Sequence, residues 1–241
     1  VSVKIMRGLG INKVAARIYY NYIHGFDTAT KFLVPALERC FHELAEAEPP
    51  VSGDYMEFGL FKGYSFWYAQ QVAQRLKLDS MRFFGFDSFV GLPEPKGIDA
   101  TQEERFYQGQ FACSRATVEQ NLDAHGVDWD RTFLIEGFFA DSLTAATRTT
   151  HGMKRVALAL IDCDLYESTV EVLEFLAPMV GDGSILIFDD WNSFGGGDDK
   201  GQRRALRQFL AANQQLSADP LFAYGHYGQV FVLRHEAGEP S

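Results

Sequence analysis

The chain has 241 residues, of which 46% are hydrophobic, enough for one α/β domain with elaborations or at most two small domains. Its formal net charge of −10 comes without any basic stripe, which argues against a nucleic-acid partner because phosphate neutralisation dominates such binding. No apolar run is long enough to cross a bilayer, so we expect a cytoplasmic protein without a membrane partner.

Residues 1–50 are predicted to form a helical N-terminal extension that serves as a lid. One helix is expected at 11–23, and Asp27-Thr28-Ala29-Thr30 is expected to cap a second helix that ends near Ala47. The alternative is that the first helix packs on the domain or on a dimer partner. The aromatic side chains that would offer flat walls to a substrate are Tyr19, Tyr20, Tyr22 and Phe26.

After Pro49-Pro50, short apolar strands alternate with amphipathic helices in a domain predicted to span 51–241. The short link Gly225-His226-Tyr227-Gly228 makes the last two strands a hairpin, so one strand must run antiparallel. The order predicts an α/β fold with a seven-stranded, mostly parallel, Rossmann-like sheet, helices on both faces and a terminal antiparallel hairpin strand. Strands are expected at 55–60, 82–87, 132–136, 157–162, 184–189, 221–224 and 229–234, and helices at 65–76, 116–125, 168–179 and 202–213.

The first strand ends in Glu57-Phe58-Gly59-Leu60-Phe61-Lys62-Gly63-Tyr64-Ser65. Gly59 and Gly63 let the backbone pass close to a ligand, and Ser65 can cap the following helix. This spacing differs from the G-x-G-x-x-G of pyrophosphate sites. A carboxylate suits the ammonium group of a ligand such as adenosylmethionine, and a simple packing turn is the alternative.

The ends of the next two strands carry further candidates for binding a nucleoside. Asp87, which precedes Ser88, can accept hydrogen bonds from both ribose hydroxyls, as in NAD enzymes, or can act as a helix cap. Gly137 and Phe138 follow the third strand and suit the edge of an adenine ring. A pair of aromatic rings packed in the core is the alternative there.

The fourth and fifth strands end in acidic residues, Asp162-Cys163-Asp164 and Asp189-Asp190. Adjacent parallel strands bring these carboxylates to one rim, where they repel one another unless a cation neutralises them or some are protonated. Oxygen ligands suit a hard ion such as Mg²⁺, or Ca²⁺ or Mn²⁺. The alternative is that these aspartates cap the helices or loops that follow.

Together these stretches resemble the TylF-type (macrocin) O-methyltransferases, which methylate sugar hydroxyls and related positions on antibiotics and other secondary metabolites. The likeness runs over about 53–209, and its most specific motifs lie at 85–93 and 161–169. The resemblance implies a class I methyltransferase fold and Mg²⁺ on Asp162, Asp189 and Asp190. It also implies S-adenosyl-L-methionine bound by residues among Glu57, Gly59, Phe61, Gly63, Ser65, Asp87, Ser88, Gly137 and Phe138.

The expected reaction is Mg²⁺-dependent methyl transfer to a hydroxyl of a secondary metabolite, with a sugar of a glycosylated natural product as the acceptor. Some relatives carry a basic Lys or His three residues after the first metal-binding Asp, where this chain has Leu165. The catalytic base is therefore open between Asp162, Asp164, His226 and a metal-bound water. We expect a homodimer, and the Gly195-Gly196-Gly197 loop is either a mobile substrate loop or a connector.

Other readings compete with this one. A metal-independent methyltransferase acting on another small molecule is the nearest alternative, and a non-enzymatic adenosylmethionine sensor is a second. A haloacid-dehalogenase-type phosphatase would need Thr or Val where Tyr166 stands. A glycosyltransferase with an Asp-x-Asp metal site would not explain Glu57-x-Gly59 or the terminal hairpin.

Overall fold

The computed structural model describes residues 25–29, 31–100 and 106–235. Seven strands form one sheet in the order β3-β2-β1-β4-β5-β7-β6. Every pairing among the first five strands is parallel, whereas β7 runs antiparallel to both β5 and β6. The predicted mostly parallel sheet with a terminal hairpin is confirmed. The strands are β1 Asp54–Phe58, β2 Phe83–Asp87, β3 Thr132–Glu136, β4 Val156–Ile161, β5 Ile185–Phe188, β6 Leu216–Tyr224 and β7 Gly228–His235.

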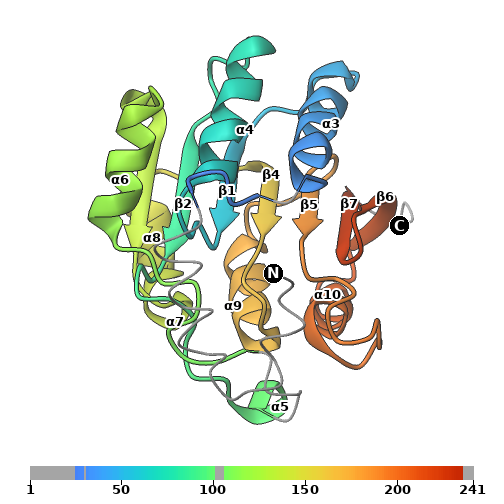
Figure 1. Cartoon of the computed structure of the whole chain (residues 1–241). Coiled ribbons are helices and arrows are strands. Elements are labelled where there is room, and N and C mark those ends of the chain that lie inside the picture. Colours follow the sequence, from blue (N-terminus) through green and yellow to red (C-terminus); the bar gives the residue numbers. More distant parts are fainter. Residues whose placement is uncertain (1–24, 30, 101–105, 236–241) are drawn as a thin grey trace.

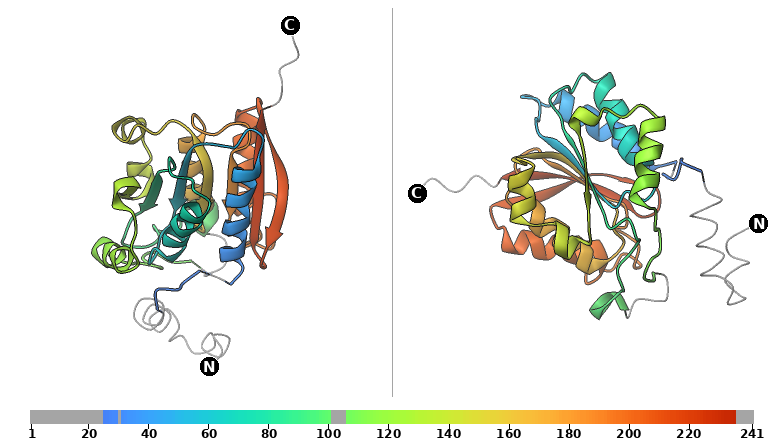
Figure 2. Two further views of the ribbon diagram at one scale, coloured as in Figure 1. Left: turned by 90° about the horizontal axis from the view of Figure 1, so that it is seen from above. Right: turned by 90° about the vertical axis from the view of Figure 1, so that its left-hand side faces the viewer.

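Helices cover both faces of the twisted sheet (Figures 1 and 2). One face packs against α3 Leu33–Glu46, α4 Tyr64–Arg75 and α6 Arg115–Ala124, and the other against α9 Tyr166–Leu176 and α10 Gly201–Ala212. Short elements complete the fold: α5 Gly97–Ala100, η3 Trp129–Arg131, α7 Phe139–Ser142 and α8 Ala145–Thr150.

The central strand β4 shows why this chain forms a buried parallel sheet. Its sequence Val-Ala-Leu-Ala-Leu-Ile is buried at every position. Alternate residues point to opposite faces, so Leu158 and Leu160 join the core under α3 and α4. Ala159 and Ile161 join the core under α9 and α10. A strand covered on both sides reads as a continuous apolar run rather than an alternating one.

The predicted cap of the second N-terminal helix is wrong. Helix α3 begins at Leu33, with Phe32 at the N-cap position and no side-chain capping bond. Pro35 lies in the first turn of α3, where a residue without an N–H group loses no intrahelical hydrogen bond. The proline therefore indicates the start of this helix better than the predicted cap does. The helix predicted at 11–23, with its tyrosines, lies outside the described residues. Side chains of α3 belong to the main core, since Leu37, Phe41 and others there are buried.

The carboxyl ends of β1, β2, β4 and β5 meet at one edge of the sheet, and α5 lies beyond that edge (Figure 1). The sheet order reverses between β1 and β4, which is the position where open α/β sheets bind ligands. In the part of the chain that the structure describes, no helix combines the length and apolarity needed to span a membrane.

Candidate active site

A cavity of about 460 Å³ opens at this edge of the sheet. That size falls within the usual range for small-molecule sites. Its walls come from the turns after the strands, from the start of α3, and from the segment that connects β2 to α6. The lining positions include 28–29, 59–61, 65, 87–88, 91–94, 110–111, 137–140, 162–165 and 189–190.

The two glycines of the first turn have different roles. Gly59 lines the cavity with φ +96°, and a Cβ there would lie 2.0 Å from the carbonyl oxygen of Asp162, so no side chain fits. Gly63, with φ +86°, lies outside the lining, and its Cβ would meet Val118 and Leu122 of α6. The close approach at Gly63 is therefore to α6, and its contact with the donor stays a prediction.

Asp87 organises the loops that form the cavity. Its Oδ2 accepts hydrogen bonds from the backbone N–H groups of Leu60 at 2.7 Å and Phe61 at 3.1 Å, and its Oδ1 accepts one from Phe89 at 2.7 Å. Burial raises the pKa of Asp87, while these backbone bonds oppose the rise. The side chain lines the cavity and holds the turn after β1 in shape, a role that differs from the helix cap considered as the alternative.

Glu57 lies beneath the cavity rather than in its wall. The side chain is fully buried and accepts hydrogen bonds from the hydroxyls of Ser65 at 2.6 Å and Tyr55 at 2.5 Å. Burial raises the pKa of Glu57 to about 8, against the lowering effect of the two hydroxyl bonds. Ser65 does line the cavity, but it is not a cap, since Gly63 occupies the N-cap position of α4 without a side-chain bond.

The residues after β2 and β3 form the adjoining wall. Ser88 accepts a hydrogen bond from Val90 N–H at 3.2 Å and donates one to the Gly91 carbonyl at 2.7 Å. Gly137, with φ +137°, donates its N–H to the Asp87 carbonyl at 3.0 Å. Phe138 is 36% exposed and lines the cavity, so the structure keeps it out of the core.

Three non-glycine residues of the lining have left-handed backbone conformations. Phe61, Phe111 and Asp164 have φ values of 49°, 60° and 61°. Such conformations cost free energy for side-chain-bearing residues and gather at functional sites. The rings of Phe61 and Phe111 meet edge to face at 5.9 Å.

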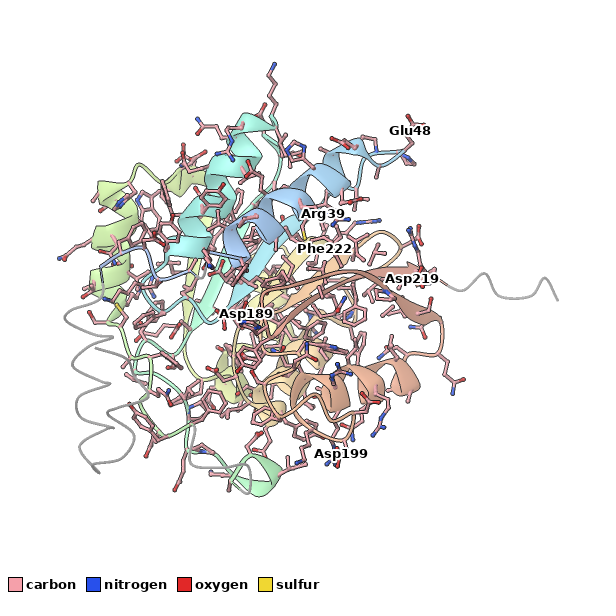
Figure 3. All side chains as sticks on the ribbon, turned by 45° about the vertical axis from the view of Figure 1, so that its right-hand side comes forward. Arg39, Glu48, Asp189, Asp199, Asp219 and Phe222 are labelled. Carbon is pink, nitrogen blue, oxygen red and sulfur yellow. The ribbon has the colours of Figure 1, made fainter. Side chains whose placement is uncertain are left out.

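The acidic ends of β4 and β5 come together as predicted. Burial and the neighbouring charges of Asp189 and Asp190 hold the pKa of Asp162 well above its usual range. Burial and Asp190 raise the pKa of Asp189 to about 6, and its hydrogen bond from Tyr224 opposes this. Figure 3 shows Asp189 near the middle of the molecule, whereas Asp199 and Asp219 lie at its periphery.

Two of these carboxylates are engaged by hydroxyl groups. The Tyr224 hydroxyl donates to Asp189 Oδ1 at 2.7 Å, and the Ser193 hydroxyl donates to Asp190 Oδ1 at 2.7 Å. No group of three or more His, Cys, Asp or Glu side chains within the described ranges is arranged to hold a metal ion. The described residues therefore do not show the Mg²⁺ site predicted on Asp162, Asp189 and Asp190, which stays a prediction, and we derive no chemical step from a metal.

The candidates for the catalytic base separate by position. Asp162, Asp164 and Leu165 all line the cavity. His226 lies in the exposed turn between β6 and β7, edge-on to the ring of Phe32 at 6.3 Å, and is outside the lining. The structure therefore does not bring His226 to the predicted reaction centre.

The glycine loop before α10 is held by one arginine. Arg203 donates hydrogen bonds to Asn192 Oδ1 at 2.6 Å, to Asp198 Oδ1 at 2.9 Å and to the Trp191 carbonyl at 3.3 Å. These bonds fasten both ends of the loop that contains Gly195-Gly196-Gly197. Those glycines do not line the cavity.

Two functional candidates were missed from the sequence. Tyr224 is the donor to Asp189, and Gly228 opposite it leaves room for the ring, since a Cβ there would lie 2.2 Å from it. Asp99 lines the cavity, is 6% exposed, and accepts hydrogen bonds from the first two residues of α9. The sequence does offer one indication of the Asp99 contact. Leu165 precedes α9 and its side chain cannot cap a helix, so a residue from elsewhere in the chain is needed for that role.

The family model described as Macrocin-O-methyltransferase (TylF) matches residues 32–224. The chain is 30% identical over 145 residues to the 8-demethyl-8-(2,3-dimethoxy-alpha-L-rhamnosyl)-tetracenomycin-C 4'-O-methyltransferase of Streptomyces olivaceus, covering 58% of this chain and 54% of that protein. It is 26% identical over 147 residues to the mycinamicin III 3''-O-methyltransferase of Micromonospora griseorubida, covering 58% and 56%. The chain thus spans about half the length of the curated relatives it matches.

Solved structures show the same architecture. The calicheamicin methyltransferase CalS11 superposes with a TM-score of 0.66 at 25% identity, over 83% of this chain and 77% of that one. The O-methyltransferase NovP superposes with a TM-score of 0.67 at 20% identity, over 85% and 80%. These likenesses confirm the predicted class I methyltransferase fold.

Proposed function

Because this chain belongs to the macrocin O-methyltransferase family, we propose that it transfers the methyl group of S-adenosyl-L-methionine to a hydroxyl on a sugar of a glycosylated natural product. The observation that carries the proposal is the cavity at the sheet's switch point, where Asp87 and the acidic strand end at Asp162 line the same space. The tetracenomycin and mycinamicin relatives are named for methyl transfer to such molecules.

The charge of the cavity favours a cationic donor over a phosphate-bearing one. Its described lining includes carboxylates from the ends of β2, β4 and β5, and Lys96 is the one lysine or arginine in it. A sulfonium ion is attracted to such a site, whereas a pyrophosphate is repelled. This distinguishes adenosylmethionine from NAD, whose ribose an aspartate at the position of Asp87 would also suit.

We assign donor contacts to residues of the lining. An ionised carboxylate has about four lone-pair positions, and backbone N–H groups occupy three of those on Asp87. We propose that a ribose hydroxyl of the donor also approaches this carboxylate, which lines the cavity. Phe138 offers its exposed ring to the adenine. Ser65, whose hydroxyl is directed to Glu57, borders the same space and would face the methionine part.

The reaction requires the acceptor oxygen to attack the methyl carbon as the carbon–sulfur bond breaks, while the hydroxyl proton leaves to a base. Asp162 lines the cavity and has a raised pKa, so it holds a transferred proton better than an ordinary carboxylate does. Holding donor and acceptor in line supplies much of the remaining acceleration. We propose Asp162 as the base, with Asp164 beside it as the alternative.

Mg²⁺ dependence remains a proposal from the resemblance, and the chemistry above routes no step through a metal. Calorimetric titration of MgCl₂ into EDTA-treated protein, with and without S-adenosylhomocysteine, decides it. A saturable heat that Asp189→Ala abolishes would support the metal. Methyl transfer that persists at full rate in excess EDTA would establish the metal-independent alternative.

We also propose that residues 1–50, apart from α3, which packs in the core, act as a lid over the acceptor. Thr28 and Ala29 from that part of the chain already line the cavity, which supports a lid. We also propose that the protein forms a homodimer, and sedimentation velocity measures its oligomeric state.

The experiment for the activity has two parts. Calorimetry should show S-adenosylhomocysteine binding to the protein, and transfer of a labelled methyl group should be seen with 8-demethyl-8-(2,3-dimethoxy-α-L-rhamnosyl)-tetracenomycin C or mycinamicin III as acceptor. Asp162→Asn, which keeps the shape of the side chain, serves as the control for the chemical step. Binding of a sugar nucleotide in place of the adenosyl ligand would contradict the assignment.

A further inference from the structure

The described parts of the segment between β2 and α6 contribute to the wall of the cavity. The two arms of this segment meet at their base, where Leu92 N–H donates to the Gln110 carbonyl at 2.9 Å and Gly109 N–H donates to the Leu92 carbonyl at 2.9 Å. The arms touch so closely that a Cβ on Gly91 would lie 2.5 Å from the Gln110 carbonyl oxygen. Pro93, Glu94 and Lys96 then extend the first arm along the cavity.

Beyond this base, Asp99 fastens the first arm to the rest of the domain. Its Oδ1 accepts a hydrogen bond from Tyr166 N–H at 2.9 Å, and its Oδ2 accepts one from Glu167 N–H at 3.1 Å. These are the first two residues of α9, whose own N-cap residue, Leu165, makes no side-chain capping bond. Asp99 thus supplies from a distant segment the acceptor that a helix N-terminus needs, and its negative charge suits that end of the helix.

The fit around this contact is close. Gly97 has φ +53°, and a Cβ there would lie 2.9 Å from Glu167 Oε1. Asp99 is 6% exposed, so the contact is shielded from water. Helix α9 also directly follows the acidic end of β4, so one side chain links the cavity wall to the strand end that carries Asp162.

From this geometry we propose that Asp99 is a positioning residue for the acceptor: by capping α9 it holds Pro93, Lys96 and Glu167 in one wall against which the acceptor sugar binds. The inference rests on the proposed function for the identity of the acceptor. The donor loops at Gly59 to Phe61, Asp87 and Gly137 make no bond to Asp99, so donor binding should not depend on it.

The test compares Asp99→Ala and Asp99→Asn with the wild type, using the rhamnosyl tetracenomycin acceptor. Alanine removes both bonds to α9, and we expect the KM for the acceptor to rise at least tenfold while the KM for adenosylmethionine stays within twofold. Asparagine keeps one acceptor oxygen, so its acceptor KM should fall between the two. Thr144→Ala is the matched control, because it removes the N-cap of α8, whose Thr144 Oγ1 accepts from Thr147 N–H at 3.1 Å outside the cavity lining.

A second readout needs no acceptor. Trypsin cleaves after Lys96, and loss of the Asp99 contact should speed cleavage of the Lys96–Gly97 bond, measured by mass spectrometry, at least tenfold in Asp99→Ala and less in Asp99→Asn. The proposal is overturned if cleavage and acceptor KM both match the wild type, or if both KM values rise in parallel. A wild-type protein that binds neither adenosylmethionine nor adenosylhomocysteine would refute the proposed function, and the trypsin rates would still decide the anchoring role of Asp99.

Discussion

Replacing Asp87 tests the central claim about the donor pocket, because one carboxylate both shapes the loops and faces the ligand. In Asp87→Asn, the amide nitrogen must face either the two N–H donors of Leu60 and Phe61 or the one of Phe89. The less costly orientation of the amide leaves Phe89 N–H without an acceptor, which should lower folding stability by about 1–3 kcal/mol. Asp87→Ala leaves all three N–H groups without one, so we expect a loss of at least ~3 kcal/mol of folding stability.

The expected consequence for binding follows from the same contacts. Misplacing the turn at Leu60 and Phe61, together with loss of the charged acceptor for a ribose hydroxyl, should weaken adenosylhomocysteine binding in Asp87→Asn at least tenfold, about 1.4 kcal/mol. Isothermal calorimetry measures the affinity, and urea unfolding measures the stability.

Asp54→Asn is the matched control for this experiment. Asp54 is a buried carboxylate that pairs with Arg82 at 2.9 and 2.7 Å, but it lies at the amino end of β1, away from the cavity. We expect it to lose stability without losing affinity. Wild-type affinity in Asp87→Asn, or equal losses of affinity in both variants, would refute the reasoning.

Three other predictions concern neighbouring contacts. Gly59→Ala should lower the free energy of unfolding in urea by several kcal/mol, because the new Cβ would overlap the Asp162 carbonyl. Gly126→Ala is the control: Gly126 has φ +74° but open space around it, so this variant should lose about 1 kcal/mol of stability. Burial raises the pKa of Glu57 to about 8, so folding stability should fall by roughly 1 kcal/mol per pH unit as the pH rises from about 4.5 to 8. The same dependence of stability on pH in Glu57→Gln would contradict this prediction. Tyr224→Phe removes the donor to Asp189 and should lower kcat about tenfold, an order-of-magnitude figure for one charged hydrogen bond, with adenosylhomocysteine affinity unchanged by calorimetry.

The sheet could be predicted because its strands carry strong local signals. The predicted strand at 132–136 agrees at both ends with β3, and the prediction at 157–162 lies one residue from β4. Strands buried on both faces consist almost entirely of apolar residues, so they appear in the sequence as continuous apolar runs. The prediction at 221–224 missed the first half of β6, since Pro220 and charged Asp219 disguise an edge strand that pairs on one side.

The site was less predictable, because sequence motifs identify side-chain types and not their partners. The sequence predicts a donor contact for Glu57, but its partner Tyr55 lies two residues away on the same face of the strand, which makes the carboxylate an internal group. The Asp99 contact joins residues 67 positions apart, and no local pattern encodes it. The acidic residues converge as expected, yet the side-chain orientation that Tyr224 and Ser193 impose depends on tertiary packing.

The place of β7 in the sheet has a consequence for how the protein is made. Strand β7 lies between β5 and β6 in the sheet. Among the described strands, β6 therefore pairs only with β7, which follows it in the chain, and joins the sheet after β7 has paired with β5. The hydrogen bond from Tyr224 to Asp189 therefore cannot form during synthesis until residues 228–235 have left the ribosome and docked. A nascent chain that stops before β7 leaves the edges of β5 and β6 open to pairing with other chains. Completion of the hydrogen bonding around the acidic ends of β4 and β5 is thus a late step of folding.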